Sequence, residues 1–202
     1  MIAKLLEALR ATSPLEAASV LLGLAYVVLA VRRSRLCWVM GGLSSAILVW
    51  LYGSTSLPMQ SALNAYYVVM SFYGYATWGR TGGAAPVVGW LPLRGHVLGW
   101  LGILLVSGLT ARLLAAETQA AWPYLDSLST SMSLFATWLT ARMRLENWLY
   151  WIAIDAVVAV LSAAQGLVSV ALLYVAYLVI AGFGFAAWLR ELRASPASAG
   201  AV

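Results

Sequence analysis

Seven long apolar runs, separated by short breaks rich in arginine, glycine and proline, constrain this chain more than any other feature of its sequence. The runs are residues 15–31, 38–52, 59–78, 97–115, 125–141, 147–163 and 168–189. A helix needs about 20 mostly apolar residues to cross a bilayer, and its backbone polar groups must be satisfied within the segment. Since these runs are too long for the strands of a membrane barrel, they predict an all-α integral membrane bundle of seven transmembrane helices.

The remaining residues exclude several classes of protein. Only 9% of the residues are charged, against about 25% in a soluble domain. Cys37 is the single cysteine and His96 the single histidine, which rules out an internal disulfide and an ordinary zinc site. The sequence has no Gly-rich phosphate loop, no paired carboxylates at short spacing and no nucleophile motif. We therefore expect neither an enzyme nor a cofactor. The net charge of +5 comes from breaks between runs, so it indicates topology rather than nucleic-acid binding.

The basic residues predict the orientation in the membrane, because cytoplasmic loops carry an excess of lysine and arginine. If the runs alternate in direction, Lys4, Arg10 and Arg112 fall on one side. The other side holds Arg32, Arg33, Arg35, Arg80, Arg94, Arg142, Arg144, Arg190 and Arg193. This distribution predicts an external N-terminus and a cytoplasmic C-terminus. Residues 1–12 are expected to form a short amphipathic surface helix rather than a signal peptide.

The two ends of the chain match without a gap when the sequence is shifted so that Trp38 falls on Trp148. In the same register Tyr67 falls on Tyr177, Gly74 on Gly184, Trp78 on Trp188 and Arg80 on Arg190. A single connecting helix restores the orientation of the second group of three, so the halves are predicted to be parallel repeats in a 3+1+3 arrangement. The halves are residues 1–80 and 125–202, joined by residues 81–124. Transporters built in this way bind their solute between the halves, whereas a scaffold subunit, the other class considered, needs no duplicated bundle.

The stretch "ENWLYWIAIDAVV" opens the sixth run and places Asn147, Trp151 and Asp155 on one face of a helix. Asp155 lies ~12 Å along this helix, where an ionisable group usually marks a solute pathway. Two alternatives stay open: Asp155 bonds a neighbouring helix to hold the bundle together, and the tryptophans form an interfacial belt. The corresponding positions of the first half hold Cys37, Gly41 and Ser45. The repeat is therefore unsymmetrical at these three positions, as expected if a single unsymmetrical solute binds between the two halves.

Polar and aromatic residues share a face of the third run, and others recur in the seventh. The third run carries Gln60, Asn64, Tyr67 and Ser71, and the seventh carries Tyr174 and Tyr177. Amides bind a sugar or an amide, and aromatic faces attract a cation by ~0.5–2 kcal/mol each. We predict that the solute is contacted by Gln60, Asn64, Tyr67, Tyr174 and Tyr177, together with Asn147, Trp151 and Asp155 of the sixth run. Helix packing is the alternative for the tyrosines, and Trp188 is expected near the cytoplasmic exit. The fifth run carries a stripe of Asp126, Thr130, Ser133 and Thr137, for which packing is expected.

Four segments carry a family resemblance. "ENWLYWIAID" and "ALLYVAYLVIAGFGFAAW" resemble the sixth and seventh helices of the PnuC nicotinamide riboside transporters, and "TSPLEAASVLLGLAYVVLAVRRSRLCW" and "NAYYVVMSFYGYATW" resemble the first and third. The resemblance covers about residues 12–193 and is weakest over 81–124. It implies a bundle related to the SWEET sugar transporters, in the bacterial cytoplasmic membrane, that takes up nicotinamide riboside, an NAD precursor. It also implies facilitated diffusion by alternating access, trapping of the solute by a cytosolic kinase, and a homotrimer.

Two departures from that family leave a second substrate open. Asn64 stands in "ALNAYY" where many relatives have Gln in "LLQVYY", and Gln165 stands in "AQGLV" where many have "YKGLY". Asn64 is a residue that we expect to touch the solute. Relatives of the family carry thiamine or riboflavin, and thiamine, like nicotinamide riboside, is a cationic aromatic with a hydroxyl group. A transporter of thiamine, or of another vitamin such as riboflavin, is therefore the alternative.

Overall fold

The computed structural model describes residues 13–54, 58–79, 87–117 and 123–194, which are almost entirely helical. The helices are α2 (Pro14–Val31), α3 (Leu36–Gly53), α4 (Pro58–Gly79), α5 (Leu93–Glu117), α6 (Pro123–Ala141), α7 (Asn147–Ala164) and α8 (Val168–Ala194). Each of the seven apolar runs falls within one of these helices, which confirms the all-α prediction. The surface helix predicted for residues 1–12 lies outside the described residues, and so does Arg80.

The first described helix begins with a capping box that its sequence encodes. The Ser13 hydroxyl oxygen accepts a hydrogen bond from the Glu16 N–H at 3.2 Å, and the Ser13 N–H donates to the Glu16 carboxylate at 2.7 Å. Pro14 occupies the first turn, where its missing N–H removes no helical hydrogen bond. These residues fix the point at which α2 starts.

The turns after α2 and after α6 share one conformation. Arg33 and Met143, which are equivalent positions of the sequence repeat, have positive φ angles of 55° and 54°. In each turn the next N–H reaches back to a carbonyl of the preceding helix. These bonds join Ser34 to Leu29 at 3.0 Å and Arg144 to Leu139 at 2.9 Å. A left-handed residue after a helix satisfies carbonyls that would otherwise lack donors, so two different sequences, "RRSR" and "RMRL", form the same tight reversal.

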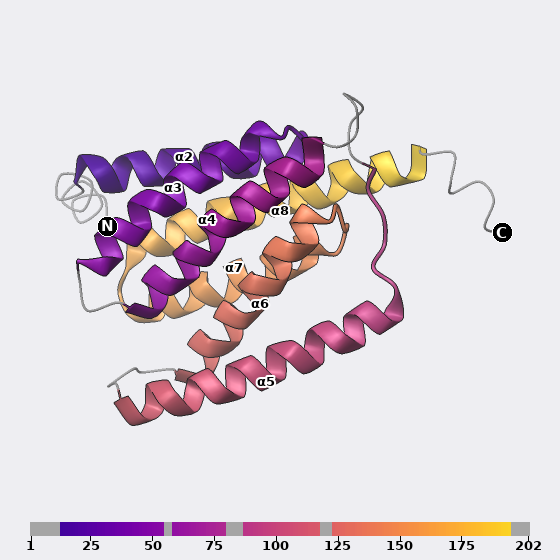
Figure 1. Ribbon diagram of the computed structural model, residues 1–202. Coiled ribbons are helices and arrows are strands. Elements are labelled where there is room, and N and C mark those ends of the chain that lie inside the picture. The colour runs from indigo at the N-terminus through magenta and orange to yellow at the C-terminus, as the bar shows by residue number, and fades with distance from the viewer. Residues whose placement is uncertain (1–12, 55–57, 80–86, 118–122, 195–202) are drawn as a thin grey trace.

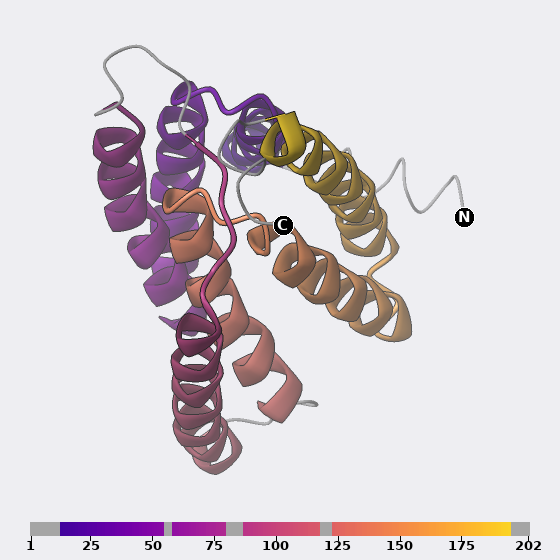
Figure 2. The same ribbon diagram turned by 90° about the vertical axis from the view of Figure 1, so that its right-hand side faces the viewer.

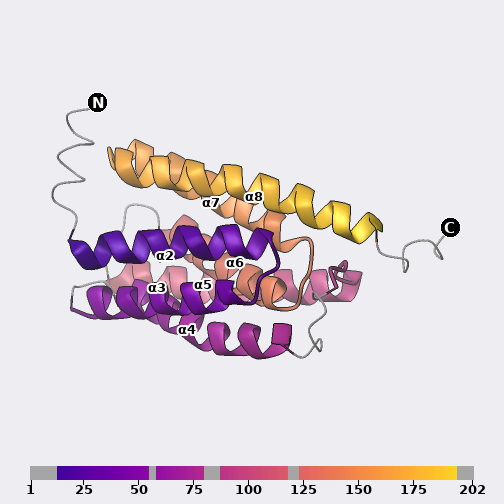
Figure 3. The same cartoon turned by 90° about the horizontal axis from the view of Figure 1, so that it is seen from above.

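The helices form two groups with the same internal order (Figure 1). α3 packs against both α2 and α4, and α7 packs against both α6 and α8. The groups meet where α2 contacts α8 and where α4 contacts α6. Seen end-on, these six helices surround a common axis, whereas α5 lies outside and packs mainly on α6, with its Trp100 ring also meeting Tyr150 of α7 (Figure 2). The view from above shows the helices running roughly side by side (Figure 3).

Five of the described helices are long and apolar enough to cross a membrane: α2, α3, α5 over Leu93–Arg112, α7 and α8. α4 and α6, with 22 and 19 residues, have the length but carry amides, hydroxyls and Asp126. Large apolar side chains face outward, and Leu21, Leu105 and Phe183 are two-thirds or more exposed. A contiguous surface of this kind suits lipid rather than water. The chain is therefore a multi-pass membrane protein.

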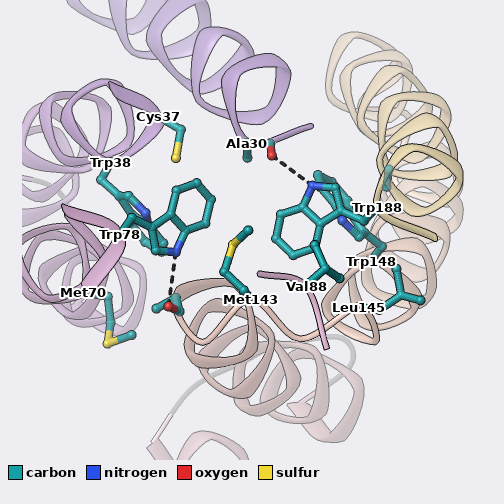
Figure 4. Close-up of a cluster of buried hydrophobic side chains, with 12 residues drawn as sticks. Ala30, Cys37, Trp38, Met70, Trp78, Val88, Met143, Leu145, Trp148 and Trp188 are labelled. Carbon is teal, nitrogen blue, oxygen red and sulfur yellow. Dashed lines mark hydrogen bonds between the residues drawn. The ribbon is translucent and has the colours of Figure 1, made fainter. Parts of the chain in front are cut away.

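Four tryptophans fill the interior at one end of the bundle. This tryptophan cluster consists of Trp38, Trp78, Trp148 and Trp188, each 2% exposed or less. Trp38 meets Trp78 edge to face with ring centroids 5.5 Å apart, and Trp148 meets Trp188 in the same way at 5.4 Å. The Trp78 indole N–H donates to the Ala141 carbonyl at 3.1 Å, and the Trp188 indole N–H donates to the Ala30 carbonyl at 3.2 Å (Figure 4). The rings thus pack the helix pairs and also connect the two groups of helices.

Two glycines allow helices to approach these rings. A Cβ atom at Gly74 on α4 would collide with the Trp38 ring, and a Cβ atom at Gly184 on α8 would collide with the Trp148 ring. Each glycine is therefore required by the size of its neighbour rather than by its own backbone conformation. The Trp and Gly matches found in the sequence correspond to equivalent contacts in the two groups.

Candidate functional site

A cavity of about 580 Å³ lies within the ring of six helices. Its lining comes from α2, α3, α4, α6, α7 and α8, and no described residue of α5 contributes. Exposed side chains mark its mouth, where α4 and α6 begin and α7 ends: Gln60, Asp126 and Gln165. Trp38 and Trp148 form its floor, at the tryptophan cluster. The volume falls within the range of sites for small organic ligands, roughly 300–1,000 Å³.

Most of the residues predicted to contact the solute line this cavity. They are Gln60, Asn64 and Tyr67 on α4, Asn147, Trp151 and Asp155 on α7, and Tyr174 and Tyr177 on α8. The stripe of Asp126, Thr130, Ser133 and Thr137 on α6, for which the sequence suggests packing, lines it as well. Helical spacing thus indicates which side chains share the lumen. Their contact with a solute stays a prediction.

Trp188 is the exception among the predicted contacts because it does not line the cavity, while its place near the cytoplasmic exit stays a prediction. The ring is fully buried in the tryptophan cluster and does not line the cavity. It is held by its hydrogen bond to the Ala30 carbonyl and by its edge contact with Trp148. Trp188 shares a face of α8 with Tyr177 and Ala181, but it lies below the floor of the cavity. Spacing along a helix gives the face and not the depth at which a cavity ends.

Asn147 connects the end of α6 to the start of α7. Its side chain is fully buried, and its Nδ2 donates to the Arg144 carbonyl at 2.6 Å. Its Oδ1 accepts from the Thr140 hydroxyl at 3.1 Å, and the Trp151 indole N–H donates to the same Thr140 oxygen at 3.4 Å. Asn147 therefore positions Trp151 through Thr140.

Asp155 lies in the middle of α7, is 5% exposed, and faces three phenols. Its carboxylate interacts electrostatically with Tyr67, Tyr174 and Tyr177. The Tyr174 and Tyr177 rings meet edge to face with centroids 5.9 Å apart. Among the described residues no Lys, Arg or His lines the cavity, so Asp155 and Asp126 give the lining a negative charge. A buried carboxylate without a cationic partner is costly, which favours a site that accepts a cation.

Two hydroxyls on α6 and the Asn64 amide on α4 donate to carbonyls of their own helices and so offer oxygen acceptors to the cavity. The Ser133 hydroxyl donates to the Ser129 carbonyl, and the Thr137 hydroxyl donates to the Ser133 carbonyl, each at 2.8 Å. Asn64 likewise uses an Nδ2 hydrogen on the Gln60 carbonyl, at 2.8 Å. The oxygens of these side chains keep lone pairs for a donor. The lining therefore suits a solute that brings positive charge together with O–H or N–H groups.

Sequence reasoning missed the contribution of α2 to the lining. Gly23, Tyr26, Val27 and Ala30 share one face of α2 and border the cavity. A Cβ atom at Gly23 would come within 2.9 Å of the Tyr177 hydroxyl, so the glycine leaves room for that phenol. A glycine and a tyrosine three residues apart in an otherwise aliphatic run are the signal that would have identified this face.

The two groups of helices present different side chains at equivalent heights. Gly41 and Ser45 line the cavity from α3, and their repeat equivalents, Trp151 and Asp155, line it from α7. The Tyr26 ring occupies the space beside Gly41, where a Cβ atom would come within 2.8 Å of it. The lumen is therefore unsymmetrical at the level of Trp151 and Asp155, as the sequence predicts.

The sequence matches a family model described as "Nicotinamide mononucleotide transporter" over residues 13–190. Two relatives named "Nicotinamide riboside transporter PnuC", from Escherichia coli (strain K12) and Shigella flexneri, are each 27% identical to this chain over 159 residues. The alignment covers 65% of this chain and 66% of each relative, so it spans just under two thirds of their length.

The fold is similar to that of a solved protein described as "Crystal structure of the Vitamin B3 transporter PnuC". The TM-score is 0.75 at 21% sequence identity, and the match covers 95% of this chain and 87% of that chain. Similarity at this level of identity shows a shared fold. It extends over all the helices that line the cavity, because so little of the chain lies outside the match.

Proposed function

This chain belongs to the nicotinamide mononucleotide transporter family, and from that premise we propose that it carries nicotinamide riboside across a membrane. The family is one of transporters rather than enzymes. The observation that supports the proposal most directly is the cavity of about 580 Å³, lined by aromatic, amide and carboxylate groups. A site of this size and chemistry, inside a membrane bundle, fits a small cationic nucleoside.

The charge of the lining supports the riboside over the mononucleotide. Both carry a cationic nicotinamide ring, but the mononucleotide adds a phosphate group. A phosphate in a partly closed site is best held by Arg or Lys, and the described lining has neither. It has Asp126 and Asp155 instead, which would repel the phosphate. The riboside brings the positive charge and hydroxyl donors that this lining can accept.

The lining residues have distinct roles in this proposal. The aromatic contacts are Tyr67, Trp151, Tyr174 and Tyr177, and the polar contacts are Gln60, Asn64, Asn147 and Asp155. Each aromatic face attracts a cationic ring by ~0.5–2 kcal/mol. Asp155 balances the charge of the ring, and the amides bind the carboxamide or the ribose hydroxyls.

We place the site between two halves, residues 1–80 and 125–202, joined by residues 81–124 in a SWEET-like 3+1+3 bundle with seven spans. Three features that recur at equivalent positions of the two halves support this arrangement. They are the left-handed residue after α2 and α6, the tryptophan–glycine contacts, and the pairing of α2 with α8 and of α4 with α6. α4 and α6 span the membrane in this proposal, with their polar faces turned to the lumen.

In this proposal the halves move against each other, so that the cavity opens to one side of the membrane at a time. The solute moves by facilitated diffusion and is trapped by a cytosolic kinase. We further propose a homotrimer in the bacterial cytoplasmic membrane, with the N-terminus outside and the C-terminus in the cytoplasm. Arginine supports this orientation: of nine described arginines, all but Arg112 lie at the end that holds the tryptophan cluster (Figure 1).

Thiamine is the second candidate, because Asn64 stands where many relatives have Gln. The shorter amide leaves more space beside a bound ring, and thiamine also brings a cationic aromatic ring to the acidic lining. Riboflavin is neutral and suits this lining less well.

Calorimetric titration of the purified protein in detergent tests the proposal, with nicotinamide riboside, nicotinamide mononucleotide and thiamine compared side by side. Binding of the riboside without binding of the mononucleotide supports it. Binding of thiamine alone keeps the family and changes the substrate. If none of the three binds, the proposed substrate class is wrong.

A further inference from the structure

A short non-helical segment, "VVGWLP", crosses one end of the bundle before α5 begins. We call residues 87–92 the strap. Its backbone pairs with the α6–α7 turn in a parallel bridge: the Gly89 N–H donates to the Met143 carbonyl at 3.0 Å, and the Leu145 N–H donates to the Gly89 carbonyl at 3.0 Å. The Arg144 guanidinium donates to the Trp90 carbonyl at 2.9 Å. The strap is therefore attached to the turn by several hydrogen bonds.

Glu146 anchors the strap a second time. One carboxylate oxygen accepts the Leu91 N–H at 2.7 Å and lies 3.3 Å from the His96 Nε2, in the first turn of α5. Glu146 is only 5% exposed, although it is an acidic residue next to the start of α7. A buried carboxylate at this place is explained by its contact with the strap.

The strap turns alternate side chains into the protein. Val88 is 4% exposed, whereas its neighbour Val87 is 71% exposed. Val88 packs in the core that contains the tryptophan cluster, together with Met143, which is also 4% exposed. Figure 4 shows Met143 between the two tryptophan pairs and Val88 beside Trp188. The side chains of the strap and of the turn thus fill the space that the four rings leave.

This packed layer closes one end of the cavity. Trp38 and Trp148 are the last rings that line the lumen, and Trp78, Trp188, Met143 and Val88 lie behind them and do not line it. The bonds from Trp78 to Ala141 and from Trp188 to Ala30 join one group of helices to the other through this layer. A solute that leaves through this end must separate these contacts, whereas the opposite end has exposed polar residues at its mouth.

The closed layer contains buried polar atoms that lack hydrogen bonds. Among the described residues, nothing pairs with the indole N–H of Trp38, the indole N–H of Trp148 or the second carboxylate oxygen of Glu146. Buried polar groups without partners raise the free energy of the state that contains them. The closed arrangement is thus less stable than a fully paired one, which suits a seal that has to open.

We propose that the strap is the gate of this end of the transporter, with Val88 and Met143 as the plug and the Gly89 bridge to the α6–α7 turn as the fastening. Solute leaves when the bridge breaks and the two tryptophan pairs move apart. The proposal rests on the proposed transport function and assigns the closing step to named residues.

Cys37 provides a built-in reporter for this opening. It is the only cysteine in the sequence, it lies in the first turn of α3 at the closed end, and it is fully buried in the same core as Val88. Its rate of alkylation by a soluble maleimide, in the purified full-length protein, measures how often this end opens. Val88→Ala is compared with Val87→Ala, which removes the same atoms from an exposed position.

We expect Val88→Ala to raise the alkylation rate roughly ten-fold, the change that about 1.4 kcal/mol produces, while Val87→Ala stays at the wild-type rate. Equal rates for the two variants, including an increase in both, would overturn the gate. If Val88→Ala does not fold, Val88→Thr keeps the shape of the side chain and is compared with Val87→Thr under the same criterion. Titration of nicotinamide riboside into the wild-type protein tests the transport substrate separately: no binding there refutes the proposed function, and the difference between positions 87 and 88 still decides the gate.

Discussion

Gly184 on α8 lies directly against the Trp148 ring on α7. The two helices can pack this closely only because position 184 has no side chain. A Cβ atom there would come within 2.6–2.7 Å of three atoms of the indole. The ring has little room to withdraw, since it is 2% exposed and meets Trp188 edge to face at 5.4 Å. We therefore expect Gly184→Ala to destabilise the protein.

Gly182, one half-turn away on the same helix, provides the matched control, because nothing lies within 4 Å of a Cβ atom built there. Alanine is favoured over glycine in a helix by about 1 kcal/mol. This gain applies to both substitutions and cancels in their comparison. Overpacking applies only at Gly184. The free energy of unfolding of Gly184→Ala should therefore be lower than that of Gly182→Ala by about 2 kcal/mol, which corresponds to roughly 4–8 °C in Tm for a chain of this size.

The intrinsic fluorescence of the ten tryptophans during a heating ramp in detergent gives both melting temperatures. Elution of each variant as a single species serves as the check that it folds before heating. If Gly184→Ala melts at or above Gly182→Ala, the contact between α8 and Trp148 is looser than the structure has it, and the reasoning is refuted. Gly74→Ala, whose Cβ atom would collide with Trp38, should behave like Gly184→Ala.

Substitutions at three further positions test the cavity and its closed end. Trp151→Ala should lower solute affinity by more than ~1 kcal/mol in calorimetry, because it removes an aromatic face; unchanged affinity in a folded variant would remove the ring from the site. Asp155→Asn should weaken binding of a cationic solute by about ten-fold or more without lowering Tm, since it removes an unpaired buried charge. Normal binding with lost uptake would instead indicate that Asp155 carries a proton. Glu146→Ala should lower the stability by about 1–3 kcal/mol because the Leu91 N–H loses its acceptor, whereas Glu146→Gln keeps one; equal melting temperatures would show that this bond contributes nothing.

The helices extend beyond the apolar runs from which they are predicted. α5 begins at Leu93, before its run at residue 97, and α8 continues to Ala194 and includes Arg190 and Arg193. An apolar run measures the length of chain suited to hydrocarbon, whereas a helix continues until its backbone is capped or broken. Hydropathy therefore predicts the existence of these helices better than their ends.

The polarity of α4 and α6 has the same origin as the site. These two helices fall short of the apolarity of the other five because their amides, hydroxyls and phenols face the cavity. Mean hydropathy detects helices that face lipid, so it is least able to detect helices that line a solute path. The one-face spacing of Gln60, Asn64 and Tyr67 carries the information that hydropathy lacks.

The strap was not predictable from side-chain patterns. Residues 87–92 have no helical or strand periodicity, and their attachment to the α6–α7 turn depends on backbone hydrogen bonds that any sequence makes equally well. Glu146 is buried because of that attachment. Its position in the sequence, next to an apolar run, does not indicate that it is buried. Such tertiary contacts depend on where the chain returns in space and not on local propensity.

Comparison of the two halves of the chain in the register of the repeat separates two kinds of position. Most of the matched aromatic and glycine positions, Trp38 with Trp148, Gly74 with Gly184 and Trp78 with Trp188, build the closed end. The unmatched pairs, Gly41 with Trp151 and Ser45 with Asp155, line the lumen. A seal made by two similar groups of helices needs equivalent parts on both sides, whereas an unsymmetrical solute needs different ones. Tyr67 and Tyr177 match and yet line the cavity, which fits a flat ring held by similar faces from two sides. Substitutions that change the choice of solute are therefore best sought at the unmatched positions, and substitutions at the matched tryptophans should act on opening instead.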